Sequence, residues 1–179
     1  GAYSEPEIPG VAADVEATQS GDEWELLVTV TNATDKAVRL KAVLAAEPGF
    51  AATHYLIPGI NYNGNEYCEN MPKGTEYNGE PWIFAYDRCS IPSCTISEDG
   101  ERVFGFFASD GDAASHVSSC SMVKKEDGSF RHLIYWPVTE APVSYTDKKK
   151  FSERYDTYLT LKPGETFRAK SLACTGRPP

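Results

Sequence analysis

The strongest constraint on the fold is an alternation of apolar and polar side chains near the start of the chain. From Trp24 to Val30 the apolar residues stand at every second position, and the same pattern recurs from Val38 to Leu44. A period of two is typical of a strand with one buried face. The polar segment Asn32–Lys36 between the two runs predicts a hairpin loop. Asn32-Ala33-Thr34 is also a glycosylation sequon, although the turn alone explains these residues.

Further strands are predicted along most of the chain, and no amphipathic helix of 11 or more residues is expected. The predicted ranges are about 12–18, 53–57, 81–87, 91–97, 101–108, 115–123, 130–136, 155–161 and 165–173. Hairpin-forming Asp-Gly or Pro-Gly turns stand at Glu98–Glu101, Glu126–Ser129 and Lys162–Glu165. The pattern predicts an all-β, antiparallel β-sandwich of roughly ten or more strands.

One segment, residues 58–81, interrupts the strand pattern. It holds four Gly, three Pro, five Asn and three Tyr in 24 residues. Irregular loops of this length tend to be functional or disordered, and disordered segments are poor in aromatic residues. We therefore expect one long irregular loop here with a function.

Composition excludes several classes of function. The chain has 179 residues and a formal net charge of −9, which argues against nucleic acid as a partner because phosphate binding needs a basic surface. No apolar run approaches the ~20 residues of a membrane-spanning helix, so no membrane partner is expected. We expect residues 1–179 to form a single domain cut from a longer protein, with a linker beginning at 174–179. No signal segment is present in this sequence, and the compartment stays open.

The cysteines and histidines do not suggest a metal site. The five cysteines are an odd number, and no second close Cys or His pair accompanies Cys89 and Cys94. We favour thiols packed as small apolar residues, and a Cys89–Cys94 bridge stays open for an exported chain. Asp110-Gly111-Asp112 resembles half of a calcium loop, but a turn explains it better. No metal and no cofactor are expected.

Aromatic and amide side chains in and after the long loop suggest carbohydrate binding. Flat aromatic rings stack on the C–H faces of sugars, while amides, carboxylates and guanidinium groups reach the hydroxyls. The candidate substrate-binding residues are Tyr62, Asn63, Asn65, Tyr67, Trp82 and Arg88. The alternatives are a simple turn around Asn63 and a core-facing strand that contains Trp82. No catalytic residue is assigned, because neither Glu140 nor the Ser115-His116 pair belongs to a recognisable constellation.

Several segments resemble a known family. The run Pro58–Asn65, the segments Asp87–Pro92 and Val103–Phe107, and the tail Leu161–Phe167 are similar to the N-terminal β-supersandwich of bacterial six-hairpin glycosidase-type proteins. The resemblance covers roughly residues 20–175. It implies a many-stranded supersandwich followed by a helical (α/α) toroid that carries the catalytic acids. It also implies that the Tyr62–Asn65 loop and Arg88 help shape the substrate pocket.

Three hypotheses about function follow. The first is a non-catalytic β-sandwich module of a larger carbohydrate-active, glycoside hydrolase-like protein, with a C-terminal helical catalytic domain of the same polypeptide as its partner. The second is an autonomous carbohydrate-binding module. The third is an immunoglobulin-like structural or adhesion domain without a sugar site.

Overall fold

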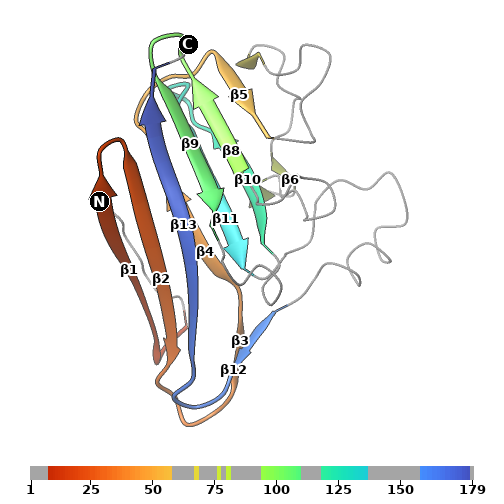
Figure 1. Cartoon of the computed structure of the whole chain (residues 1–179). Helices are drawn as coiled ribbons and strands as arrows, with labels where there is room; N and C mark the ends of the chain where they lie inside the picture. Colours follow the sequence, from red (N-terminus) through yellow and green to blue (C-terminus); the bar gives the residue numbers. More distant parts are fainter. Residues whose placement is uncertain are drawn as a thin grey trace.

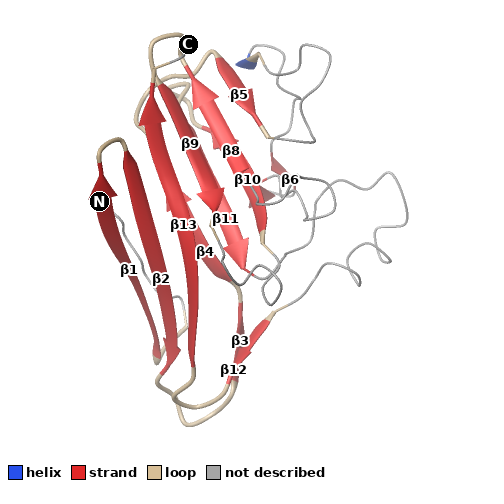
Figure 2. Cartoon of the chain, viewed as in Figure 1, coloured by secondary structure: helices blue, strands red, loops and turns tan. Residues whose placement is uncertain are grey.

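The structure of the chain, a computed structural model, describes residues 8–57, 67–68, 76–77, 80–81, 94–109, 118–136 and 158–177. Within these ranges the secondary structure consists of antiparallel strands apart from a single residue in 3₁₀ conformation, Cys68, and no α-helix occurs (Figure 2). The prediction of an all-β antiparallel sandwich is confirmed. In the same ranges, no helix is long and apolar enough to cross a membrane.

A six-stranded sheet forms one layer of the molecule (Figure 1). Its strand order is β1-β2-β13-β9-β8-β5, and every neighbouring pair is antiparallel. The strands are β1 (Val11–Ser20), β2 (Glu23–Asn32), β13 (Thr166–Gly176), β9 (Val103–Ala108), β8 (Cys94–Glu98) and β5 (His54–Leu56).

Two smaller sheets form the second layer, which lies behind the large sheet in Figure 1. One has the order β10-β11-β4, with β10 (Ser119–Lys124), β11 (Phe130–Trp136) and β4 (Ala42–Ala46). The other pairs β12 (Leu159–Leu161) with β3 (Val38–Leu40). A separate short pair consists of β6 (Glu76–Tyr77) and β7 (Glu80–Pro81).

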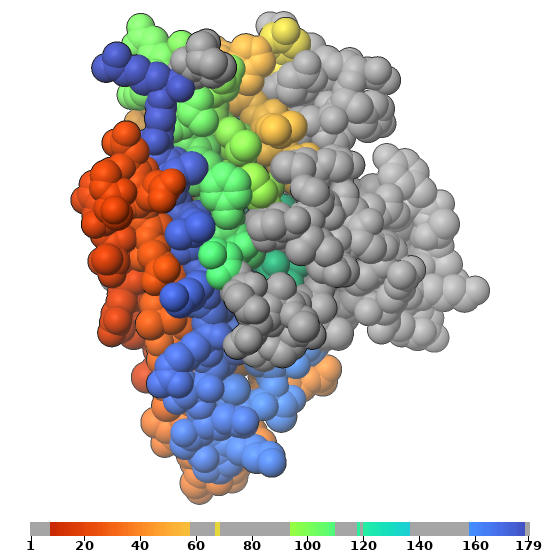
Figure 3. All heavy atoms as spheres, viewed as in Figure 1, coloured from red at the N-terminus to blue at the C-terminus, as the bar shows by residue number. Residues whose placement is uncertain are grey.

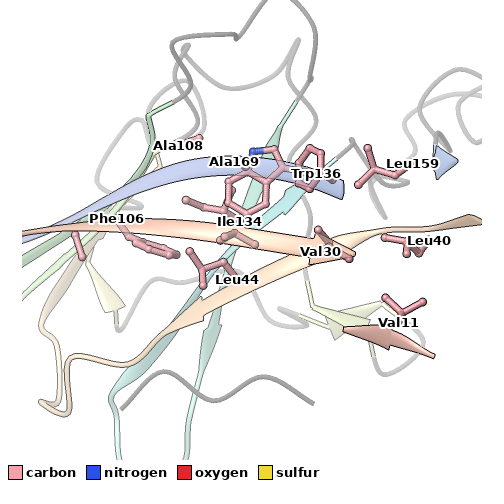
Figure 4. Packing of buried hydrophobic residues seen from close by; sticks show 14 of the residues in the cluster. Val11, Val30, Leu40, Leu44, Phe106, Ala108, Ile134, Trp136, Leu159 and Ala169 are labelled. Carbon is pink, nitrogen blue, oxygen red and sulfur yellow. The ribbon is translucent and has the colours of Figure 1, made fainter. Parts of the chain in front are cut away.

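The hydrophobic core lies between the two layers (Figure 4). Alternation turns Val30 of β2 and Phe106 of β9 inward, where they belong to one cluster with Ile134 and Trp136 of β11. The side chains of Phe106, Ile134 and Trp136 are 0% exposed. Burial of a side chain of this size contributes about 1.5–3 kcal/mol, so the period of two in the sequence is also the pattern that stabilises the sandwich.

The segment Asn32–Lys36 is a turn, but the hairpin predicted there is wrong. β2 pairs with β1 and β13, whereas β3 pairs with β12 in the other layer. The run Val38–Leu44 is likewise two strands, because the hydrogen-bonding partner changes from β12 to β11 after Leu40. Leu40, Ala42 and Leu44 are all buried, so their periodicity shows which side faces the core but not which strand lies alongside.

Asn32 holds this crossover in place and is not available for a glycan. Its side chain is 0% exposed. The amide nitrogen donates to the carbonyls of Lys36 at 2.7 Å and Leu161 at 2.9 Å, and the amide oxygen accepts from the backbone and hydroxyl of Thr34. Both amide hydrogens are therefore used inside the fold, which makes the sequon a structural turn.

Two of the three predicted turn segments close hairpins. Glu98–Glu101 joins β8 to β9, and the Asp99 carboxylate accepts hydrogen bonds from the backbone of Glu101 and Arg102. Glu126–Ser129 joins β10 to β11. The third segment, Lys162–Glu165, does not close a hairpin, because β12 and β13 belong to different layers.

The remaining strand predictions agree with the structure within a few residues. The ranges 12–18, 53–57, 91–97, 101–108, 115–123, 130–136, 155–161 and 165–173 correspond to β1, β5, β8, β9, β10, β11, β12 and β13. β13 continues to Gly176, three residues into the segment expected to begin a linker. Most of the predicted loop 58–81 and residues 82–87 lie outside the described residues, although β6 and β7 fall within the loop.

The described cysteines agree with thiols packed as small apolar residues. Cys68 and Cys174 are free thiols, and Cys68, Cys94 and Cys120 are buried. Cys89 lies outside the described residues, so its pairing with Cys94 is not tested. Within the described ranges, no three His, Cys, Asp or Glu residues are grouped to hold a metal ion.

Candidate functional site

The candidate site lies on the outer face of the six-stranded sheet, at its β5 edge. Tyr67 forms an isolated antiparallel bridge with His54 and so extends this edge by one residue. The backbone N–H of Cys68 donates to the carbonyl of Thr53 at 2.9 Å and holds the extension in register. Figure 3 views the molecule from the side of this sheet, where β1 and β2, β13, and then β9 and β8 succeed one another across the surface.

Four side chains meet at this edge, and we call them the edge cluster: Thr53, His54, Tyr67 and Glu98. The rings of His54 and Tyr67 are 4.5 Å apart between centroids and tilted by 52°. The His54 Nδ1 atom lies 3.2 Å from the Glu98 Oε1 atom and 3.0 Å from the Thr53 hydroxyl oxygen. Tyr67 is 43% exposed, and the side chains of His54 and Glu98 are 34% and 33% exposed.

Strand alternation explains why the cluster faces solvent. His54 stands directly opposite Glu98 in the β5–β8 pair. Their neighbours in sequence, Tyr55 and Ser97, point into the sandwich and are 4% and 1% exposed. Because side chains on a strand alternate between faces, the burial of Tyr55 and Ser97 requires His54 and Glu98 to point outward.

The edge cluster has the chemistry of a sugar-binding surface. The Tyr67 ring provides an exposed apolar face, and the Glu98 carboxylate accepts hydrogen bonds from hydroxyl groups. Nδ1 of His54 is engaged by Glu98 and Thr53, and no hydrogen bond joins its Nε2 atom to another residue within the described ranges. The Thr53 hydroxyl, which is exposed, both donates and accepts.

The contact between His54 and Glu98 fixes the orientation of the imidazole. A carboxylate bound to one ring nitrogen of a histidine sets the tautomer and the direction of the ring. His54 and Glu98 are bound to each other in this way, at 3.2 Å. The His54 ring is therefore held in one orientation beside the Tyr67 ring.

A second polar cluster is buried between the layers. His132 of β11 is 0% exposed, and its two ring nitrogens are bound to hydroxyls of β8. Nδ1 lies 2.8 Å from the oxygen of Thr95, and Nε2 lies 2.9 Å from the oxygen of Ser97. Phe104 contacts the imidazole edge-on, with 4.9 Å between centroids. Burial lowers the pKa of His132 from 6.5 to about 3, so the neutral ring joins the two sheets and has no access to a ligand.

One of the six residues predicted to bind substrate lies in the described structure. Tyr67 is exposed in the edge cluster, as a sugar contact requires, and its role stays a prediction. The other five lie outside the described residues: Tyr62, Asn63, Asn65, Trp82 and Arg88. Glu140, His116 and the Asp110–Asp112 turn also lie outside them.

His54, Glu98 and His132 are not among the site residues predicted from the sequence. The signal for His132 is its place in Phe130-x-His132-x-Ile134-x-Trp136, which puts it on the apolar face of a strand. The signal for Glu98 is weaker, because its own turn segment Glu98–Glu101 explains an acidic residue there. The pairing of His54 with Glu98 brings together residues 44 positions apart, and the pattern of a single strand does not contain such a contact.

Comparison with known proteins identifies the class of fold to which the sandwich belongs. No protein-family model and no curated protein sequence matches the chain. Solved structures do match. A galactose mutarotase-like protein from Clostridium acetobutylicum superposes with a TM-score of 0.55 at 12% identity over 99% of this chain. A galactose mutarotase related enzyme from Lactobacillus acidophilus gives 0.52 at 10% identity over 98%, and a candidate aldose 1-epimerase from Klebsiella pneumoniae gives 0.53 at 10% identity over 97%.

The fold is therefore that of the galactose mutarotase-like β-sandwich proteins. Identities of 10–12% show the fold alone. This chain spans 48% of the Klebsiella protein, 61% of the Clostridium protein and 66% of the Lactobacillus protein, so it corresponds to about half to two thirds of their length. The comparison bears out the β-sandwich, whereas no match supports the N-terminal domain of a six-hairpin glycosidase in particular.

Proposed function

We propose that this chain is a carbohydrate-binding β-sandwich module that holds sugar at the edge cluster and has no turnover of its own. The observation that carries the proposal is the exposed Tyr67 ring beside an imidazole and a carboxylate that are bound to each other at 3.2 Å. Support also comes from the fold, which the chain has in common with proteins whose names refer to galactose and aldoses.

In a larger protein the module supports catalysis by a neighbouring domain. We place it in a glycoside hydrolase-like polypeptide with a helical catalytic domain after Pro179, where Tyr62, Asn63, Asn65, Tyr67, Trp82 and Arg88 contribute substrate contacts. The support for this extension is the sequence resemblance of the Pro58–Asn65 loop. A helical domain in the parent polypeptide and slower hydrolysis after Tyr67→Ala are the expected results. A parent protein without such a domain contradicts the extension but leaves sugar binding by the module untouched.

Titration calorimetry of the isolated chain tests sugar binding directly. The ligands are D-glucose, D-galactose and their short oligosaccharides. Wild type is expected to bind at least one of them, and Tyr67→Ala is expected to weaken binding about tenfold or more, by analogy with the ~1–3 kcal/mol contributed by a nucleobase that stacks on an aromatic side chain. Tyr158→Ala is the matched control, because Tyr158 is 38% exposed but lies beside the β3–β12 pair. Absence of binding to every sugar contradicts the proposal and favours a structural or adhesion domain.

A mutarotation assay separates binding from catalysis. The optical rotation of freshly dissolved α-D-galactose relaxes at the rate of the uncatalysed reaction if the module only binds. We expect the same relaxation rate with and without the protein at equal pH and buffer concentration. An acceleration that is lost in Glu98→Gln contradicts a purely binding role for the edge cluster.

A further inference from the structure

The outer face of the six-stranded sheet is divided into a charged half and an apolar half. On β1 and β2 the outward positions carry Asp14, Glu16, Glu23 and Glu25, all exposed. On β9 the outward positions are Val103, Gly105 and Phe107, without one polar side chain. A sheet that faces water normally alternates apolar inward and polar outward residues, so the apolar half departs from the expected pattern.

The centre of the apolar half is a phenylalanine that leans over a glycine. A Cβ atom built on Gly105 would lie 2.7 Å from Cε2 and 2.8 Å from Cζ of Phe107, and 2.9 Å from the sulfur of Cys174. The far end of the Phe107 ring therefore occupies the space above Gly105, two residues back along β9. Only a residue without a side chain permits this position, since real Cβ contacts are not shorter than 3.0 Å.

The residues next to this ring are uncharged and half-buried, and the acidic row of β2 lies beside them, with Glu25 opposite Leu172 and Glu23 opposite Cys174. Ile96 stands opposite Gly105 on one side, and Leu172 stands opposite Phe107 on the other; both are half-buried. Burial raises the pKa of the Cys174 thiol, the backbone hydrogen bond from Gly105 lowers it, and the nearby Glu23 carboxylate raises it further, with a net upward shift that keeps this side chain neutral. We call these five residues the Phe107 platform: Ile96, Gly105, Phe107, Leu172 and Cys174.

The Phe107 platform adjoins the edge cluster. Glu98 pairs with Val103, so Gly105 is its diagonal neighbour across the β8–β9 ladder, at about 7–8 Å between Cα atoms. Leu56, which is 39% exposed, stands opposite Ile96 and continues the apolar surface to the β5 edge. The two surfaces are thus continuous, with hydrogen-bonding groups at the edge and an aromatic ring further in.

We propose that the sugar-binding surface extends from the edge cluster onto the Phe107 platform, and that its ligand is an oligosaccharide of at least two sugar units. One unit binds at Tyr67, His54 and Glu98, and the next stacks on the leaning ring of Phe107. This inference rests on the proposed function and assigns its ligand class, a glycan chain instead of a free monosaccharide. Continuity with the edge cluster and the lack of charge on the five platform residues favour a neutral glycan, and the adjacent Glu23 and Glu25 disfavour an anionic one.

The test compares affinities along series of increasing chain length by calorimetry. The first series is D-glucose, maltose and maltotriose. The second is D-glucose, cellobiose and cellotriose, and the third is D-galactose with its β-1,4-linked dimer and trimer. For the series that binds, we expect wild type to gain about tenfold or more in affinity from monosaccharide to disaccharide. Phe107→Ala is expected to abolish this gain and to leave monosaccharide affinity within about twofold, whereas Tyr67→Ala weakens both. A tenfold change in affinity corresponds to about 1.4 kcal/mol of binding free energy.

Gly105→Ala provides a second variant that keeps the aromatic ring. The added methyl displaces the end of Phe107 from the platform, so the gain with chain length should fall while the strand pattern in circular dichroism is retained. A wild type that binds monosaccharide and disaccharide equally well overturns this inference and leaves the proposed function standing. A wild type that binds no sugar overturns both. A self-association seen by light scattering and lost in Phe107→Ala, with the gain in sugar affinity unchanged, overturns the inference in favour of a protein contact.

Discussion

The two histidines of the described structure show how burial decides the role of one residue type. His132 is 0% exposed, lies between the two layers, and has both ring nitrogens bound to hydroxyls of β8. The His54 side chain is 34% exposed, lies on the outer face, and has one ring nitrogen bound to Thr53 and Glu98. His132 is therefore a structural connection between sheets, whereas His54 belongs to a cluster on the surface of the described structure.

The largest effect is expected from removing the buried histidine. His132→Ala leaves a cavity and two buried hydroxyls without their partner, which together cost about 3 kcal/mol or more. His54→Ala, its matched control, is expected to change the free energy of unfolding by less than about 0.5 kcal/mol, as is usual for exposed positions. Urea unfolding of both variants measures the difference. Equal destabilisation by the two substitutions contradicts the comparison.

The buried histidine also predicts how stability depends on pH. The pKa of His132 is about 3 in the folded chain and about 6.5 when unfolded, so below pH 6.5 the unfolded state binds a proton that the folded state does not. Stability is therefore lost as pH falls from 6.5 towards 3, at up to about 1.4 kcal/mol per pH unit. The stability of His132→Gln should lack this contribution.

Carboxylates contribute to the same pH range and must be separated from His132. Hydrogen bonds to Arg102 and Ser129 lower the pKa of Asp99 and Asp127, and those to Lys125 and Arg131 lower that of Glu47. These groups also lose stability as pH falls, but they are identical in wild type and His132→Gln. The difference in unfolding free energy between the two proteins, measured from pH 7 to 4, isolates the histidine. A difference that is constant with pH contradicts the assignment.

Two buried serines refine the comparison at a smaller scale. Ser97 is 1% exposed and bound to His132, whereas Ser121 is 0% exposed and its hydroxyl has no hydrogen-bond partner among the described residues. Ser97→Ala is expected to cost about 1–3 kcal/mol, because it leaves a nitrogen of His132 unsatisfied. Ser121→Ala is expected to be neutral or to stabilise by up to about 1 kcal/mol, because it removes an unsatisfied group. Thermal unfolding of both variants checks the sign of each change.

The outcome at these residues shows what a single sequence can and cannot predict. The period of two predicts most strands and the inward direction of residues such as Val30 and Ile134. Side chains alternate between the two faces of a strand, so the sequence of each strand alone shows which of its faces is buried. Strand pairing is different. The Asn32–Lys36 turn looks like a hairpin loop locally, and only the bonds of Asn32 to Lys36 and Leu161 show that the chain crosses between layers there.

The candidate site was predicted less completely for the same reason. Tyr67 was selected from its own segment, by the aromatic and amide character of the loop. The edge cluster requires three separate segments around residues 53–54, 67 and 98 to meet, and the Phe107 platform requires β9 to lie beside β8 and β13. Contacts of this kind depend on sheet order, which no local pattern contains.

The smallest effect on stability is expected at the edge cluster, where Glu98→Gln should instead change binding. Partly exposed ion pairs contribute about 0–1 kcal/mol, so unfolding should shift by a few tenths of a kcal/mol. Sugar affinity should fall several-fold, since charge-assisted hydrogen bonds are roughly twice as strong as neutral ones. Glu101→Gln, an exposed carboxylate in the adjacent turn, is the matched control and should leave affinity unchanged. If Glu98→Gln changes stability more than affinity, then Glu98 resembles Ser97 and His132 as a structural group, and the contrast between the two histidine sites is lost.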